Sequence, residues 1–180
     1  MKAIIDAIEF KRLIDGTKKF TSVYGANKMQ YIHLRFENGE VRAAALDGYR
    51  ASVEYAKYKG DNFTCYVKTT MPKLKGINEV AVELVGDRAL VIAGEDIIGC
   101  KQPEGEFYPV DKIIADELEK ENIGVVGVNP TFLIDALKSI SGITTKDKIA
   151  KIEIRSKTEP IIIRSGEKNV KLILPMRIEV

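Results

Sequence analysis

The sequence contains no tryptophan, one histidine and two cysteines in 180 residues. The histidine, His33, alternates with apolar residues as in a strand, so we expect it at a surface or rim position and not in a catalytic site. Cys65 and Cys100 form no Cys-x-x-Cys motif, which predicts two buried free thiols in a reducing compartment. A phosphate-binding loop, a His-Glu-x-x-His motif and a Gly-x-Ser-x-Gly motif are also missing. With no spaced metal cluster and no acid/base pair, we expect a protein that is not an enzyme and needs no cofactor.

Long apolar runs and an excess of one charge are missing as well. No run approaches the roughly 20 apolar residues of a transmembrane helix, and Asp6 and Glu9 near the N-terminus argue against a signal peptide. We therefore expect a cytoplasmic protein without membrane contact. The 28 Lys and Arg residues nearly balance the 26 Asp and Glu residues, giving a formal net charge of +2. This balance excludes a general polyanion-binding surface but allows a local basic face.

The sequence does contain one order of predicted elements three times. Each copy is a strand, a helix and three strands in about 55–60 residues, and a repeat of this size takes precedence over other fold assignments. The predicted helices are 6–20, 70–75 and a segment beginning at Asn129-Pro130. The predicted strands are 31–36, 41–45, 50–57, 62–68, 79–85, 88–93, 96–102, 123–128, 149–155, 159–165 and 169–178. A linker rich in proline, glycine and charge covers residues 103–122. One copy has a sheet with only one small helix, so it must pack against a neighbour.

The first and third predicted helices have apolar stripes at helical spacing, which we expect to face a core. In the third helix, Asn129 is a good N-cap and Pro130 suits the first helical position. Between the first two strands, Asn38-Gly39 predicts a tight hairpin turn. The two stripes are Phe10, Leu13, Ile14 and Thr17 in the first helix, and Phe132, Leu133, Ala136, Leu137 and Ile140 in the third.

Four short stretches resemble motifs of one protein family. They are Asp47-Gly48-Tyr49-Arg50, Gly105-Glu106-Phe107-Tyr108-Pro109, Asn129-Pro130-Thr131-Phe132-Leu133 and Leu174-Pro175-Met176-Arg177. Each could be only a turn with its flanking core, but the four in this order are fairly specific. The chain resembles the bacterial DNA polymerase III beta subunit, the sliding clamp. At the corresponding positions, members of this family carry Asp-Gly-His-Arg, Gly-x-Phe-Pro, Asn-Pro-Lys-Tyr-Leu and Met-Pro-x-Arg.

The chain also departs from the family pattern. Tyr49 replaces the usual histidine, Leu46 replaces a small polar residue, and Tyr108 stands where a proline is expected. Family clamps are typically acidic, whereas this chain carries a small positive charge. A family chain has six half-domain units, and we count three here.

The resemblance implies an α+β DNA-clamp fold of three half-domain units, about one and a half clamp domains. Residues 1–115 resemble the middle domain, and residues 116–180 resemble the C-terminal half of the last domain. Met1 and the terminal motif lead us to expect a complete chain. Because family rings contain twelve half-units, four chains would supply a tetrameric ring. Two chains could instead pair their third units as a dimer.

The function implied by the resemblance is that of a non-enzymatic processivity factor. Such a clamp encircles double-stranded DNA without sequence preference and binds DNA polymerase and other clamp-binding proteins, and a clamp loader could serve it. One alternative is an adaptor or decoy that binds clamp-motif peptides, or a full clamp, without encircling DNA. A second alternative is a small enzyme with its site in residues 103–122.

Two sets of residues follow from the resemblance. In the family, the C-terminal strand and the middle domain form a hydrophobic groove for peptides of the type Gln-Leu-x-Leu-Phe. Carried over by position, the groove residues are Met29, Leu46, Gly48, Tyr49, Arg50, Ala51, Tyr108, Lys112, Ile113, Leu172, Leu174, Pro175, Met176 and Arg177. The helices face DNA in the family, and sliding requires phosphate contact without base readout. The candidate DNA-facing residues are Lys11, Arg12, Lys18, Lys19, Lys68, Lys73, Lys75 and Lys138, each of which could equally be part of a solvated helix face.

Overall fold

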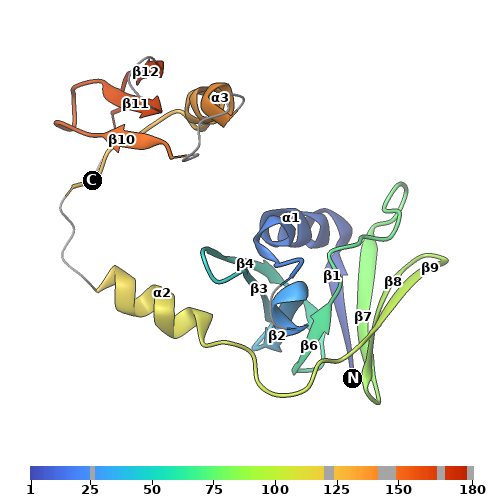
Figure 1. Ribbon diagram of the computed structural model, residues 1–180. Helices are drawn as coiled ribbons and strands as arrows, with labels where there is room; N and C mark the ends of the chain where they lie inside the picture. Colours follow the sequence, from blue (N-terminus) through green and yellow to red (C-terminus); the bar gives the residue numbers. More distant parts are fainter. Residues whose placement is uncertain (25–26, 120–123, 142–148, 166–168, 178–180) are drawn as a thin grey trace. The chain divides into compact units, whose positions relative to one another are not determined.

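The structure, a computed structural model, describes residues 1–24, 27–119, 124–141, 149–165 and 169–177. The chain divides into two compact units, Met1–Glu117 (unit 1) and Leu118–Val180 (unit 2). Both are α+β, with few helices and antiparallel sheets (Figure 1). The predicted boundary, at residue 115, lies close to the division between the units.

Unit 1 contains nine strands, two α-helices and two short 3-10 helices in its described part. The strands are β1 (Lys2–Asp6), β2 (Ile32–Glu37), β3 (Glu40–Leu46), β4 (Ala51–Lys57), β5 (Lys59–Gly60), β6 (Phe63–Val67), β7 (Glu79–Val85), β8 (Arg88–Ala93) and β9 (Asp96–Lys101). The helices are α1 (Ala7–Thr17), η1 (Lys18–Phe20), η2 (Asn27–Gln30) and α2 (Val110–Leu118), whose last residue belongs to unit 2.

The two sheets of unit 1 exchange strands between its two half-units. One sheet has the order β5-β1-β7-β8-β9 and the other β4-β3-β2-β6. The first strand of the first half-unit, β1, therefore pairs with β7 of the second half-unit, with Ala3 opposite Val82. Conversely, the first strand of the second half-unit, β6, pairs with β2, with Cys65 opposite Leu34. Because of this exchange, both half-units contribute to one continuous core.

The core follows the periodicities predicted from the sequence. In β2, alternate residues Ile32, Leu34 and Phe36 are buried, as expected for a strand with one face on a core. In α1, the whole predicted stripe is buried. Asp6 caps this helix, since its Oδ1 accepts hydrogen bonds from the backbone N–H groups of Ile8 and Glu9 at 2.9 and 3.1 Å. The first predicted helix is therefore confirmed.

The hairpin turn between β2 and β3 is also confirmed. Asn38 and Gly39 have φ angles of +52° and +77°. Two successive positive φ angles are typical of a type I′ turn, whose twist matches that of the flanking strands. The turn sets the register that places Phe36 opposite Val41.

The predicted helix over residues 70–75 is wrong. The segment is not helical, and Pro72 within it is buried, while Met71 and Leu74 pack against the core. Six residues are too few for a stable helix without strong packing of one face. The backbone N–H of Lys73 instead donates to Asp96 Oδ2 at 2.9 Å. The second half-unit thus uses an extended strap where the first has α1.

Four other elements of unit 1 differ from the prediction. The strands β1 and β5 and the 3-10 helix η2 were not predicted, and the predicted linker over residues 103–122 contains α2. Val110, Ile113 and Ile114 have the helical i, i+3, i+4 spacing, and Val110 is buried. The proline, glycine and charge around them conceal this signal in the sequence.

Unit 2 contains one helix, α3 (Pro130–Ser141), and the strands β10 (Lys151–Glu153), β11 (Ile161–Ser165) and β12 (Asn169–Ile173) in its described part. The strands form one sheet in the order β10-β11-β12. Asn129 caps α3 as predicted, since its Oδ1 accepts a hydrogen bond from Thr131 N–H at 2.9 Å. The predicted strand over residues 123–128 is reduced to one bridge, between Gly127 and Met176, and residue 123 lies outside the described residues.

The predicted apolar stripe of α3 is only partly covered. Ala136 is buried and Leu133 half-buried, but Phe132 and Leu137 are exposed. The side chain of Ile140 lies outside the described part. Unit 2 has a small core of Ala136, Ile161, Ile163 and Ile173, which is too small to cover the whole helix face.

Candidate functional site

The end of β12 and the segment that follows it expose apolar side chains at alternate positions. Leu172, Leu174 and Met176 are 59%, 67% and 52% exposed, whereas Ile173 between them is 4% exposed. The backbone of this segment is held in place, because Met176 N–H donates to Gly127 O at 2.9 Å. A backbone fixed in this way presents its outward side chains as a regular apolar row.

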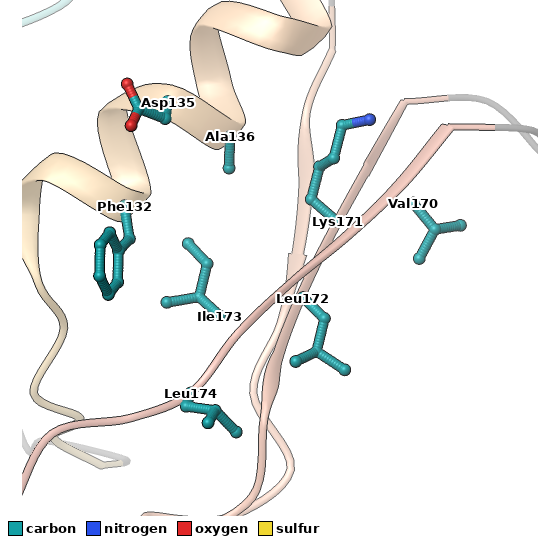
Figure 2. Close-up of a pocket in the computed structure, with 8 residues that line it drawn as sticks. All are labelled: Phe132, Asp135, Ala136, Val170, Lys171, Leu172, Ile173 and Leu174. Carbon is teal, nitrogen blue, oxygen red and sulfur yellow. The ribbon is translucent and has the colours of Figure 1, made fainter.

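A cleft of about 800 Å³ lies between α3 and β12. Figure 2 shows Phe132 extending from the helix and Ile173 from the strand into the space between the two elements, with Leu174 at one end. Asp135 and Lys171 are the charged residues of its lining. Clefts of this size with apolar walls and few polar groups suit small apolar ligands or side chains. Sequence reasoning placed Phe132 in the core, so it did not predict that this residue lines a cleft.

In unit 1, the groove candidates Gly48, Tyr49 and Arg50 lie with Asp47 in a tight turn between β3 and β4. Asp47 Oδ1 accepts hydrogen bonds from the backbone N–H groups of Tyr49 and Arg50 at 3.0 and 3.1 Å, and Gly48 has a φ of +89°. Arg50 Nε donates to Asp47 Oδ2 at 2.8 Å. The hydrogen bond from the Arg50 side chain, together with those from the backbone, lowers the pKa of Asp47. The turn is therefore ordered by Asp47, and it leaves the Tyr49 ring almost fully exposed.

The other groove candidates of unit 1 differ in accessibility. Leu46 is buried at the end of β3, so its side chain offers little surface. Met29 and Tyr108 are half-buried, and Ala51 is exposed. Lys112 and Ile113, on α2, are exposed. In unit 2, Pro175 is half-buried and Arg177 exposed.

A buried arginine connects α2 to the sheet of β2 and β3. The Arg42 side chain is 5% exposed, and its Nε lies 2.5 Å from Oδ1 of Asp111, which is 45% exposed. Arg35 Nη1 lies 3.6 Å from the other carboxylate oxygen. These contacts position the start of α2, where groove candidates Lys112 and Ile113 lie.

Replacing Asp111 by asparagine should lower the free energy of unfolding by about 2 kcal/mol. The buried guanidinium of Arg42 would lose its counter-charge, and the half-exposed carboxylate moderates the loss. Urea unfolding measures the effect. The matched control is Asp87→Asn, because the Asp87–Lys101 pair is exposed and should change stability by less than about 0.5 kcal/mol. Equal effects of the two variants would contradict a structural role for the Arg42 pair.

His33 is half-buried at the same place. Its ring stacks on Phe107, with centroids 4.5 Å apart and an angle of 11° between planes. Burial, and then the charges of Arg42 and Arg35, lower the pKa of His33 to about 4. The imidazole is therefore neutral at neutral pH.

The lowered pKa of His33 predicts that stability falls with acidification. The unfolded state binds a proton at His33 below about pH 6.5, and the folded state does so only below about pH 4. The stability that depends on the neutral imidazole is therefore fully present above pH 6.5 and is lost as the pH falls toward 4. We expect a loss of about 2 kcal/mol between pH 7 and pH 5. Urea unfolding at pH 7 and pH 5, with His33→Gln as the control, measures how much His33 contributes to this change in the free energy of unfolding. A variant with the same pH dependence as the natural chain would contradict it.

The basic residues of the first helix are mostly neutralised. Lys11 and Lys18 both pair with Asp15. The hydrogen bond from Lys11, and after it the hydrogen bond from Lys18, lowers the pKa of Asp15. Arg12 pairs with Glu9 at 2.9 Å and with Glu54 of β4 at 2.6 Å. Sequence reasoning identified these cations correctly as outward-facing but missed their acidic partners.

The remaining candidate DNA contacts are exposed lysines. Lys68, Lys73 and Lys75 are exposed on the extended strap and its flank, not on the helix that was predicted. Lys138 is exposed near the C-terminal end of α3. The structure thus places Lys11 and Arg12 on α1, Lys18 and Lys19 on the adjoining η1, and Lys138 on α3, so only these candidates have a helical setting.

Two general features limit other kinds of site. No helix within the described residues is long and apolar enough to cross a membrane. The same part of the chain has no group of three His, Cys, Asp or Glu side chains placed to hold a metal ion. Both cysteines are buried and free, and burial raises the pKa of each thiol.

The comparisons with known proteins find the fold but no similar sequence. No family model and no curated protein matches the chain. The DNA polymerase III beta chain of Streptococcus pneumoniae TIGR4 matches over 97% of this chain, with a TM-score of 0.77 and 16% identity. The C. crescentus beta sliding clamp matches over 97%, with a TM-score of 0.78 and 15% identity. The DNA polymerase sliding clamp of Bacillus subtilis matches over 99%, with a TM-score of 0.77 and 16% identity.

The matches confirm, at the level of the fold, the resemblance seen in the sequence. They cover 49%, 50% and 50% of the three solved chains. The chain thus has the fold of the bacterial sliding clamps, the beta subunits of DNA polymerase III, and spans about half of their length.

Proposed function

We propose that this chain is a clamp-like scaffold for DNA replication that binds partner proteins through short apolar peptides and catalyses no reaction itself. One observation carries the proposal: Leu172, Leu174 and Met176 form an exposed apolar row beside the cleft of α3 and β12. Exposed apolar residues that are contiguous, as opposed to scattered, are typical of interaction sites.

The chemistry of this row suits a peptide with leucine and phenylalanine side chains. Methionine and leucine give an adaptable apolar surface, and Phe132 adds an aromatic wall. Arg177 and, in unit 1, Arg50 can donate hydrogen bonds to peptide carbonyls or a carboxylate. Tyr49, Tyr108, Lys112 and Ile113 of unit 1 remain proposed contacts of the same peptide.

Fluorescence anisotropy with a labelled Gln-Leu-Ser-Leu-Phe peptide tests the proposal. We expect saturable binding to the full chain in the micromolar range, and weaker binding of a peptide with the same residues in scrambled order. The scrambled peptide controls for general hydrophobic adsorption, because it has the same composition. Equal binding of both peptides, or none of either, would overturn the proposal.

We further propose weak, sequence-independent contact with double-stranded DNA through the basic residues of α1, in a homo-oligomer that encircles the duplex. Mobile lysine charges suit contact with phosphates without base readout. The ion pairs of Lys11, Arg12 and Lys18 favour the alternative, an adaptor that binds peptides without encircling DNA. A direct measurement of DNA binding decides between the two functions.

A further inference from the structure

Unit 2 follows the plan of the first half-unit of unit 1. Each has a first strand or extended segment, a capped helix and three antiparallel strands, and then a return to the first segment. In unit 1 the return is the pairing of Ile4 with Lys59, and in unit 2 it is the bridge of Gly127 with Met176. In both cases the N-cap of the helix comes two residues later: Asp6 after Ile4, and Asn129 after Gly127. Residues 125–128 therefore correspond to the start of β1.

The strand registers extend this correspondence to β10. In unit 1, Leu34 lies opposite Ala43, which lies opposite Glu54. In unit 2, Ile152 lies opposite Ile163, which lies opposite Lys171. Lys171 precedes Met176 by as many residues as Glu54 precedes Lys59. Ile152, Ile163 and Lys171 therefore correspond to Leu34, Ala43 and Glu54. In the same way, Ile154 corresponds to Phe36.

Equivalent residues are buried in unit 1 and exposed in unit 2. Leu34 and Phe36 are 0% and 2% exposed, whereas Ile152 and Ile154 are 52% and 57% exposed. In unit 1 the second half-unit covers this site, because β6 pairs along the edge of β2. In the described part of unit 2, β10 is an edge strand paired only with β11. Edge strands with apolar faces are ready templates for another strand.

The same comparison applies to the first segment. In unit 1, one edge of β1 pairs with β5 and the other with β7. In unit 2, the bridge with Met176 occupies the first of these edges, and Val125 is exposed. Unit 2 therefore contains counterparts of both strands that unit 1 pairs across its half-units. Residues 125–128 correspond to β1 and β10 corresponds to β2, and in the described part of unit 2 each has an edge without a paired strand.

We propose that unit 2 is completed by unit 2 of a second copy of this chain. Residues 125–128 of each copy pair antiparallel with β10 of the other, so the contact is two-fold and self-complementary. The register follows from Ala3 opposite Val82 and Cys65 opposite Leu34 in unit 1. It places Val126 of one copy opposite Ile152 of the other, and Val128 opposite Ala150. The proposal depends on the fold alone and not on peptide or DNA binding.

A cleft in unit 2 marks where the second copy would insert side chains. It has a volume of about 240 Å³ and is lined by residues 124–126 and 154–157. In unit 1, the corresponding Ala3 and Phe36 belong to one core with Val82 and Phe63 of the second half-unit. By the register above, a second copy supplies Ile152 at the place of Val82 and brings its Gly124 opposite Ile154, at the place of Phe63. A half-unit of this size cannot bury both faces of its sheet by itself.

Solution mass tests the proposal on the full chain. We expect a concentration-dependent dimer, or a multiple of it, by light scattering coupled to size exclusion. Ile152→Glu should raise the dissociation constant of the dimer on the order of 100-fold, because it buries a charge between the strands. Val170→Glu is the matched control, since Val170 is equally exposed on the opposite edge strand, and it should leave the mass unchanged. Circular dichroism verifies that both variants fold.

Cysteine cross-linking tests the register without disturbing the interface. Under mild oxidation, a mixture of Val126→Cys chains and Ile152→Cys chains should give a covalent heterodimer, because directly opposite residues meet disulfide geometry. The native cysteines are buried and do not compete. A mixture of Val126→Cys and Val170→Cys chains should give none. A monomer at all concentrations, or a dimer that Val170→Glu disrupts and Ile152→Glu does not, would overturn the proposal, as would cross-linking of both mixtures alike.

Discussion

Replacing Leu174 and Met176 together by aspartate should weaken binding of the Gln-Leu-Ser-Leu-Phe peptide about 100-fold or more, which corresponds to about 3 kcal/mol. Both side chains are more than half exposed, so the substitutions remove apolar contact area and leave the core intact. Carboxylates on the apolar row must also be desolvated when the peptide binds. Fluorescence anisotropy measures the loss, and urea unfolding should give nearly the same stability as the natural chain.

The matched control for this double variant is Val85→Asp with Ile97→Asp. These two aliphatic side chains of unit 1 have similar exposure, and the control adds the same charge. It should bind the peptide as the natural chain does. Similar losses in both double variants would show that negative charge alone weakens binding. Unchanged binding by the Leu174 and Met176 variant would remove these residues from the site.

Unit 1 could be predicted where local periodicity decides the structure. The stripe of α1, the alternation of β2 and the Asn38-Gly39 turn depend on residues close in sequence. The strap at Pro72 and the helix α2 were misjudged because short segments take their structure from tertiary packing. β1 has its partner β7 more than 70 residues away, so no local pattern could assign it.

The candidate site could be predicted only in part. The family resemblance picked out the terminal row, and the structure leaves Leu174 and Met176 exposed. The resemblance could not reveal that Leu46 is buried, because burial depends on neighbouring strands. It also missed the pair of Arg12 with Glu54, which are 42 residues apart. Charge on a helix face can be read from the sequence, but its neutralisation by a distant strand cannot.

Replacing Lys11, Lys18 and Lys19 together by glutamine should weaken duplex DNA binding at least about 10-fold at low salt, if α1 and the adjoining η1 face DNA. The slope of log affinity against log salt should also fall by about 2 to 3, because each lost phosphate contact removes about 0.9. Arg12 is left unchanged, since its contacts with Glu54 and Tyr55 O connect α1 to β4. Electrophoretic mobility shift over a salt series gives both quantities.

The control removes three other lysines, Lys57, Lys59 and Lys101, all exposed on the strands of unit 1. It has the same net charge, and Lys57 and Lys101 also have acidic partners. Equal losses in both triple variants would mean that net charge, and not α1, attracts DNA.

Asp15→Asn gives a test of opposite sign. Asp15 neutralises both Lys11 and Lys18, so removing its charge should release two cations for phosphate contact. If α1 faces DNA, the variant should bind more tightly than the natural chain and with a steeper salt dependence. Glu83→Gln, which releases only Lys2 on β1, is the matched control for added net charge. A gain confined to Asp15→Asn supports encirclement with α1 against the duplex. Equal gains in the two variants, or none, favour the adaptor, because the ion pairs of α1 would then serve only the helix.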